Sequence, residues 1–186
     1  MVSSFSRKTF AAIVLFFIAA SAIKASLTPR ISFEELVSRS EIIAQARVLE
    51  SWSAWDSEHR YIWSHYRMQV TDAIRGGALS TIVVSEPGGT VGGVSEAVVG
   101  VNAWRPGDNV IVFLHRVPNG YLRTTGGPQG NARISLDGRV VLASGAALVG
   151  TAAGTDLRRL SGLPLGEFKS RLREEARDHP LRAAVR

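Results

Sequence analysis

The stretch YIWSHYRMQVTDAIRG, Tyr61 to Gly76, decides how the rest of the chain is expected to fold. Its side chains alternate with a period of two residues, which is the pattern of a half-buried β-strand. One face carries Ile62, Ser64, Tyr66, Met68 and Val70, and the other carries Tyr61, Trp63, His65, Arg67 and Gln69. The sequence therefore predicts a long central strand, and the neighbouring segments are expected to close against it.

Short strands separated by turn residues are predicted on both sides of this central strand. Glu41 to Trp52 alternates in the same way and predicts a first long strand with Ala44, Ala46 and Val48 pointing inward. The near-continuous apolar run of residues 109–115 is typical of a strand in the middle of a core. Further strands are expected at residues 80–85, 94–101 and 121–125, with a last small hairpin around residues 137–138.

Two helices are expected at the ends of this β region. Ser32 followed by Glu35 is a capping-box pattern, and it predicts a short helix over residues 32–40. Near the C-terminus, apolar side chains recur at helical spacing within residues 156–178 and predict an amphipathic helix that docks on the β domain or caps its end. Residues 144–155, SGAALVGTAAGT, are small and flexible and are predicted to be a linker.

The expected fold class is mainly β. Several short strands, one helix in front and no alternation of strands with long helices favour a small antiparallel OB-like barrel over residues 31–143. A small β-sandwich is the alternative that the same pattern allows. In either case the strand region forms one domain, since 186 residues suffice for a leader, a single core and a tail.

Residues 1–25 are predicted to be a secretory signal peptide. Arg7 and Lys8 precede the apolar run of residues 10–20, and small residues follow, so that cleavage after Ala22 or after Ala25 fits. An uncleaved anchor is the alternative, but spanning a bilayer takes about 20 apolar residues. The expected location is therefore secreted or periplasmic, with no stable membrane span after cleavage.

Composition narrows the expected partners. The formal charge of +6 comes from the ends, because residues 26–155 carry eleven arginines and eleven acidic residues. Nucleic acid is not an expected partner, since its binding needs a basic patch on the folded domain. The chain has no cysteine, which excludes disulfides, thiolate metal sites and a cysteine nucleophile.

The order of these segments resembles a known group. A helix, EIIAQARV, the long strand, IVVSEPGG, RPGDNVIVFL and GGPQG follow one another as in a group of uncharacterised secreted bacterial proteins. The resemblance covers residues 31–142 and implies an OB-type barrel similar to the netrin-type fold of tissue inhibitors of metalloproteinases. It implies no catalytic residues. The animal inhibitors depend on an N-terminal cysteine and disulfides, which this chain lacks.

No motif for a metal, a cofactor or a catalytic nucleophile was identified. His59 and His65 lie six residues apart, which in an extended strand is roughly 20 Å and too far to share one ion. No G-x-S-x-G elbow is present, although a triad can still assemble from scattered residues. The carboxylate pairs worth testing for hydrolysis are Glu86 with Glu96, and Asp56 with Glu58.

Two glycine-rich segments allow two interpretations. They are Glu86 to Gly93, EPGGTVGG, which is too rich in glycine for a strand interior, and Gly126 to Gly130, GGPQG. Glycines in all-β chains mark bends and bulges of the sheet. The alternative is that these loops approach a ligand, and the residues expected to do so are Gly88, Gly89, Gly92, Gly127 and Gln129.

Aromatic residues give the strongest functional signal. Trp52, Trp55, Tyr61 and Trp63, with His65, cluster around the connection between the first two long strands. Exposed rings are suited to stacking on sugars or to a protein interface, unless a helix covers them. The sequence therefore predicts an exported, non-enzymatic binding module for a protein or polysaccharide ligand of the cell envelope, of open oligomeric state. The alternatives are a secreted hydrolase with a scattered active site and a peripheral membrane protein.

Overall fold

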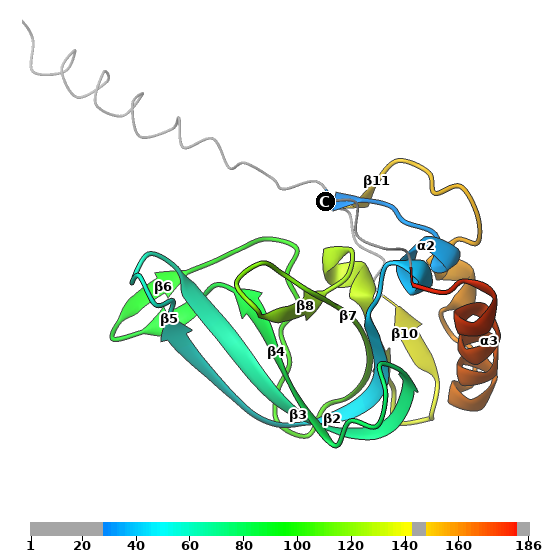
Figure 1. The fold of residues 1–186 in the computed structure, drawn as a ribbon, viewed down its shortest axis with the longest axis horizontal. Helices are drawn as coiled ribbons and strands as arrows, with labels where there is room; N and C mark the ends of the chain where they lie inside the picture. Colours follow the sequence, from blue (N-terminus) through cyan, green and yellow to red (C-terminus); the bar gives the residue numbers. More distant parts are fainter. Residues whose placement is uncertain (1–27, 143–147, 182–186) are drawn as a thin grey trace, which may run out of the picture.

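The central strand forms as predicted and lies in a seven-stranded sheet. A computed structural model describes residues 28–142 and 148–181, and Figure 1 shows their arrangement. The predicted signal peptide and residues 144–147 of the predicted linker lie outside these ranges. In sheet order the strands are β10 (Val140–Leu142), β9 (Asn131–Ile134), β7 (Asn109–Arg116), β2 (Ile42–Trp55), β3 (Ile62–Arg75), β4 (Thr81–Pro87) and β8 (Leu122–Thr124).

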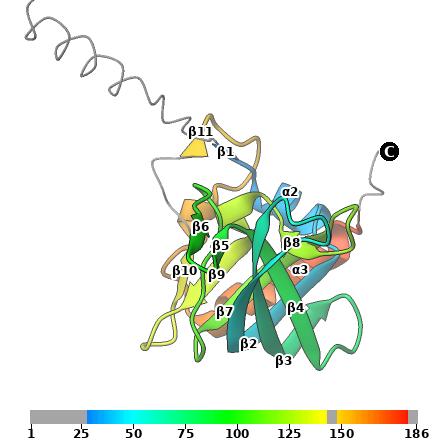
Figure 2. The same cartoon turned by 90° about the vertical axis from the view of Figure 1, so that its left-hand side faces the viewer.

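The sheet contains parallel and antiparallel pairs, and it curls so that β8 pairs with both β4 and β7. Most neighbouring strands are antiparallel, but β4 pairs with β8 in parallel through the single pair Val84 and Leu122. Strand β8 also pairs antiparallel with β7, so the ladder that leaves β7 through β2, β3 and β4 returns to it (Figure 2). The predicted mainly β fold class is confirmed, but the sheet is mixed rather than wholly antiparallel, and it is not a clean barrel.

The first glycine-rich segment contains a strand that was not expected. Residues Gly89–Val91 (β5) pair with Val94–Glu96 (β6) in a small hairpin, and the strand predicted over residues 94–101 ends at Glu96. A Cβ atom on Gly89 would lie 2.5 Å from Ser53 Oγ and 2.7 Å from Ser64 Oγ. The glycine is therefore needed where β5 approaches β2 and β3.

Two groups of apolar side chains fill the molecule. The first, here called the inner core, lies within the curled sheet and includes Ala44, Met68, Val84, Trp104 and Leu122. The second, the outer core, joins the other face of the sheet to the helices and includes Ile43, Phe113, Phe33, Phe168 and Leu172. Strands β2 and β7 contribute to both groups, because their alternating side chains are buried on each side.

A β-bulge in β2 determines which side chains face outward near its end. Val48 pairs with Met68, but the next pair is Glu50 with Arg67, so Leu49 is an extra residue. Ala44, Ala46 and Val48 point inward as predicted. Before the bulge the even-numbered side chains of β2 point inward, and after it they point outward. Trp52 therefore faces outward, where it pairs with His65 across the ladder.

The two predicted helices form and pack together in the outer core. Helix α2 (Phe33–Ser38) begins at Ser32, whose Oγ accepts a hydrogen bond of 3.1 Å from Glu35 N. Helix α3 (Leu165–Asp178) buries Phe168 and Leu172, and a short 3-10 helix, η2 (Leu157–Leu160), precedes it. No helix in the described part of the chain is long and apolar enough to cross a bilayer.

Arg75, at the end of β3, connects both helices to the sheet. Its Nη1 donates to the carbonyls of Val37 and Ser40 beside α2. Its Nη2 donates to the carbonyls of Ala176 and His179 at the end of α3, at 2.7 and 2.6 Å. One guanidinium therefore satisfies the C-terminal carbonyls of two helices, where a positive charge also complements the helix dipoles.

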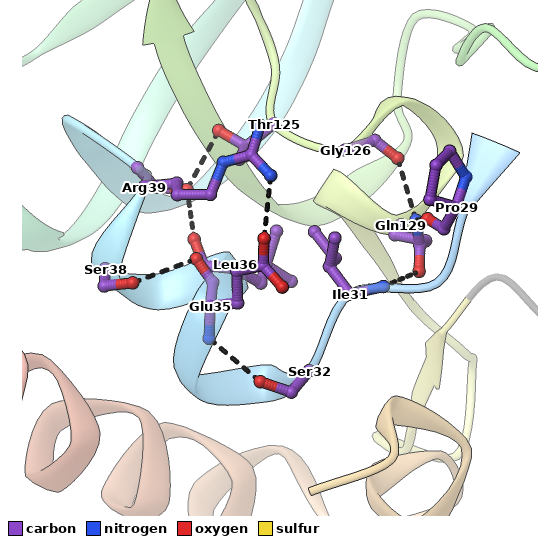
Figure 3. A network of polar contacts seen from close by, with 11 residues as sticks. Pro29, Ile31, Ser32, Glu35, Leu36, Ser38, Arg39, Thr125, Gly126 and Gln129 are labelled. Atoms are coloured by element: carbon purple, nitrogen blue, oxygen red, sulfur yellow. Dashed lines mark hydrogen bonds and ion pairs between the residues drawn. The ribbon is translucent and has the colours of Figure 1, made fainter. Parts of the chain in front are cut away.

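The second glycine-rich segment forms a 3-10 helix, η1 (Gly127–Gly130), that anchors the start of the described chain. Gln129 Oε1 accepts from Ile31 N at 3.0 Å, and its Nε2 donates to Pro29 O at 2.9 Å (Figure 3). Just before this point, β1 (Thr28–Pro29) pairs in parallel with β11 (Leu148–Val149). Gln129 thus joins segments that lie about 100 residues apart.

Candidate functional site

Three of the residues singled out in the sequence lie on the outer side of the β2–β3 ladder. Trp52 is paired with His65, and Ala54 with Trp63, so Trp52, Trp63 and His65 share one side. Trp52 is 41% exposed and Tyr61 is 58% exposed, whereas Trp63 is half-buried. The predicted cluster therefore exists, and part of it is open to solvent.

Ring contacts connect these side chains with a tyrosine from another hairpin. Trp52 stacks on His65 with their centroids 5.3 Å apart. Tyr121 meets His65 edge-on at 5.5 Å and Trp63 at 5.0 Å, and the guanidinium of Arg123 lies over the Trp63 ring at 5.7 Å. We call this surface the aromatic face and define it by Trp52, Trp63, His65, Tyr121 and Arg123.

Two predicted aromatic residues lie at the tip of the β2–β3 connection. Tyr61 lies beneath the guanidinium of Arg60, 5.9 Å from the ring centroid. Trp55 is half-buried and stacks on His59 at 6.4 Å. Trp55 pairs with Ile62 and therefore lies on the opposite side of the ladder from Trp52. The hairpin is ordered locally by Asp56, whose carboxylate accepts from Arg60 N at 2.7 Å.

The helices do not cover the aromatic face in the described structure. Helix α3 packs against α2 and the far end of β3, around Ile74 and Arg75. Figure 1 shows both helices at one end of the molecule and the β5–β6 hairpin at the opposite end. The sequence allowed a helix to cover the rings, but α2 and α3 pack elsewhere on the sheet.

Tyr121 and Arg123 were missed by the sequence analysis. They belong to the β7–β8 hairpin, whose second strand was predicted over residues 121–125, and they alternate with the buried Leu122. That alternation is a signal that both side chains share a face. The sequence does not show which sheet neighbour they meet, because β8 reaches β3 and β4 only through the curl of the whole sheet.

A serine and a histidine are paired beneath Trp52. His65 Nδ1 lies 2.8 Å from Ser85 Oγ, and burial lowers the pKa of the His65 imidazole below its ordinary value. Ser85 is 2% exposed and lies within strand β4. Within the described residues no carboxylate is hydrogen-bonded to His65. A catalytic triad needs an accessible nucleophile, whereas Ser85 is buried, and the observed contact holds the His65 ring beneath Trp52.

A buried carboxylate lies behind the aromatic face. Glu86 is 1% exposed and accepts hydrogen bonds from Thr124 N at 3.0 Å and from Thr124 Oγ1 at 2.5 Å. Arg123 Nη2 lies 3.4 Å from its other oxygen. Burial raises the pKa of the Glu86 carboxyl, against the opposing effect of these donors and of the Arg123 charge.

Glu86 and Glu96, paired in the sequence analysis, line one cleft of about 270 Å³. Glu96 Oε2 accepts from Ile62 N at 2.9 Å. Of the predicted glycines, Gly88 and Gly89 also line this cleft. The other predicted pair, Asp56 and Glu58, lies in the β2–β3 connection, where Glu58 forms an exposed ion pair with Arg60.

The remaining predicted loop residues lie elsewhere. Gly92 is in the turn between β5 and β6, with open space where a Cβ would be. Gly127 lies against the carbonyl of Gly100, and the amide of Gln129 is occupied by Ile31, Pro29 and Gly126. The structure therefore brings the aromatic residues together but does not place these loop residues on the same face. In the described ranges no three His, Cys, Asp or Glu residues are grouped as metal ligands.

The fold and the site describe a mainly β protein with an exposed aromatic surface on its sheet. No family model matches this chain, and no curated protein matches it significantly.

Proposed function

We propose that this protein is an exported, non-enzymatic binding module whose aromatic face holds a polysaccharide or protein ligand of the cell envelope. The observation that carries the proposal is the unbroken series of ring contacts from Trp52 through His65 and Tyr121 to Trp63, with Trp52 open to solvent. The signal-peptide pattern of residues 1–25 supports export to a secreted or periplasmic location.

We also propose that the curled sheet is an OB-type barrel, similar to the netrin-type fold. Three features support this assignment: the antiparallel order β2–β3–β4, the parallel contact of β4 with β8, and the antiparallel return of β8 to β7 and of β7 to β2. OB-type barrels bind oligosaccharides and oligonucleotides on the face of their strands. The aromatic face occupies such a strand face, and the neutral charge of residues 26–155 favours a saccharide over a nucleic acid.

The arrangement of the rings supports binding because the rings are already fixed. Aromatic side chains bury large apolar areas and stack in defined geometries. Here Trp52 is held by His65, which Ser85 holds in turn at 2.8 Å. A ligand that stacks on this surface therefore pays little for ordering the side chains, and preorganisation of this kind increases affinity.

Tryptophan fluorescence tests the proposal. Acrylamide should quench Trp52 strongly, whereas Trp104 is 4% exposed, with its Nε1 donating to Asn131 at 3.1 Å, and should be protected. A panel of cell-wall oligosaccharides and peptides is then titrated. A ligand should reduce the quenching, and Trp52→Ala should weaken its binding at least about tenfold, the scale of a stacking residue at a hot spot. Unchanged affinity of Trp52→Ala for every ligand that binds would refute the aromatic site.

A secreted hydrolase is the second candidate, and the shared cleft of Glu86 and Glu96 favours it. A carboxyl with a raised pKa can act as a general acid, and a second carboxylate can activate water. The test is release of reducing ends from the same oligosaccharides. Hydrolysis that is lost in Glu96→Gln but kept in the matched variant Glu58→Gln would establish this activity. Binding without hydrolysis would leave the binding module as the function.

A further inference from the structure

Arg123 differs from the other arginines around the aromatic face. Arg60 forms an ion pair of 2.8 Å with Glu58, and Arg67 one of 2.6 Å with Glu50, and all four side chains are exposed. The carboxylate nearest to Arg123 is the buried Glu86, at 3.4 Å. The charges of Arg60 and Arg67 are thus matched at the surface, whereas that of Arg123 has no surface partner among the described residues.

The donors of Arg123 are also incompletely used. Its Nε is buried and has no hydrogen-bond partner among the described residues. Its hydrogen bond from Nη2 to Glu86 is long, and Glu86 Oε1 is already occupied by Thr124. The side chain is 30% exposed, so the guanidinium reaches solvent beside the Trp63 ring. Because Nε is buried and Nη2 is held by Glu86, the donor left for a ligand is Nη1, which is neither among the buried atoms without a partner nor hydrogen-bonded to a described residue. A charged donor of this kind forms a strong hydrogen bond with a carboxylate.

We propose that the ligand of the aromatic face is an acidic saccharide, and that Arg123 binds its carboxylate while Trp52, Trp63 and Tyr121 stack on its sugar rings. This inference rests on the proposed function and names the chemical class of its ligand. The exposed ring of Trp52 favours a saccharide over a peptide, because a sugar presents a flat, apolar C–H face that packs on an aromatic ring, while Tyr121 and Trp63 contribute ring edges beside it. Arg123 then adds the charge that distinguishes acidic from neutral chains.

The test compares one oligosaccharide in two forms. The probes are oligogalacturonate and the same oligomer with its carboxyl groups reduced to alcohols, titrated calorimetrically into the full protein at low and high salt. The wild type should bind the acidic form at least about tenfold more tightly, since charge-assisted hydrogen bonds exceed neutral ones. High salt should reduce this preference. Arg123→Gln should bind both forms equally.

Control variants separate charge from folding. Arg123→Lys keeps the charge and should keep part of the preference for the acidic form. Arg171→Gln removes an exposed arginine of α3, which is paired with Glu167 at 2.7 Å, and should leave the preference unchanged. Thermal unfolding of each variant verifies that it is folded. If Arg123→Gln is unfolded, a smaller preference for the acidic form in Arg123→Lys than in Arg171→Gln supports the role of Arg123, and an equal preference in the two variants overturns it.

The outcomes distinguish this inference from the proposed function. Equal binding of both forms by the wild type, abolished by Trp52→Ala, would overturn the role of Arg123 and keep the aromatic site. A preference that survives in Arg123→Gln would also overturn it. Binding of neither form would overturn the acidic-saccharide inference, and binding of peptides instead would assign the face to a protein ligand.

Discussion

Glu86 links the pH of the solution to the stability of the protein. Burial raises the pKa of this carboxyl above its ordinary value of 4.5 in the folded state. Between these two pKa values the folded protein binds more protons than the unfolded chain, so the free energy of unfolding falls as the pH rises. Relative to Glu86→Gln, the wild type should therefore lose stability as the pH increases above 4.5.

Urea unfolding of wild type and Glu86→Gln at a series of pH values measures this difference. Glu58→Gln, which changes an exposed carboxylate, is the matched control. Parallel stability profiles of wild type and Glu86→Gln across the acidic range would contradict the expectation. Glu86→Ala should lower the free energy of unfolding more than Glu86→Gln does. Alanine leaves the buried N–H and hydroxyl of Thr124 without an acceptor, at a cost of about 1–3 kcal/mol.

His65 should titrate at a lower pH than an ordinary histidine. Burial lowers its pKa below 6.5, so on acidification the unfolded chain takes up protons before the folded protein does. The contribution of His65 to the free energy of unfolding is therefore fully present above pH 6.5, and it is lost as the pH falls through the pKa of the folded state. Because His65 stacks on Trp52, its protonation should change the fluorescence of that tryptophan with a midpoint below 6.5.

A second stacked pair supplies the control for this titration. His59 stacks on Trp55, so the measurement is made in a His59→Gln background, where the remaining histidine next to an exposed tryptophan is His65. The transition should disappear when His65→Gln is added. A midpoint at or above 6.5 would show that His65 is solvated rather than held between Trp52 and Tyr121.

At the level of secondary-structure elements, Arg75 holds the helices against the sheet. Arg75→Gln should lower the free energy of unfolding by at least about 2 kcal/mol, since charged hydrogen bonds to the carbonyls of α2 and α3 are lost. Hydrogen exchange should then accelerate in the last turn of α3. The comparison variant Arg171→Gln removes an exposed pair within α3 and should cost no more than about 0.5 kcal/mol. Equal effects of the two variants would refute a special role for Arg75.

The alternation of side chains predicted the long elements well, because a half-buried strand has a period of two residues. Strands β2 and β3 follow that alternation, whereas β7 was predicted from its near-continuous apolar run and the helices from a capping box and from helical spacing. Two features did not follow from it. The bulge at Leu49 reverses the faces of β2, and β5 forms in a segment rich in glycine. Both depend on contacts between strands that are distant in sequence, and local pattern does not record them.

The candidate site was also predicted only in part, because some of its residues meet through contacts between strands that are distant in the sequence. Trp52, Tyr61, Trp63 and His65 are neighbours across one hairpin, so a local pattern was enough to group them. Tyr121 and Arg123 join them only through the β7–β8 hairpin. The buried Glu86 looked like a loop carboxylate in the sequence, because the donors of Thr124 that satisfy it come from another strand.

On the scale of the whole molecule, the outer core beneath the helices and the aromatic face are separate regions, and substitutions in them should affect stability differently. Phe168→Ala removes a fully buried ring of the outer core, which packs 6.1 Å from Phe33, and should cost about 3–5 kcal/mol. Trp52→Ala should cost no more than about 1 kcal/mol, because its side chain is partly exposed. Chemical denaturation of both variants verifies this contrast. A large loss of stability in Trp52→Ala would mean that the aromatic face is a structural support.

The order of α3 and the strands along the chain also has a consequence for protein synthesis. A ribosome makes α2 and the strands before Phe168 and Leu172, which complete the outer core. Until then a nascent chain leaves the apolar side chains of α2, β2 and β7 that belong to the outer core without the cover of α3. The outer core therefore reaches its complete packing only after α3 has been synthesised, whereas the inner core, which contains no residue of α3, can form before it.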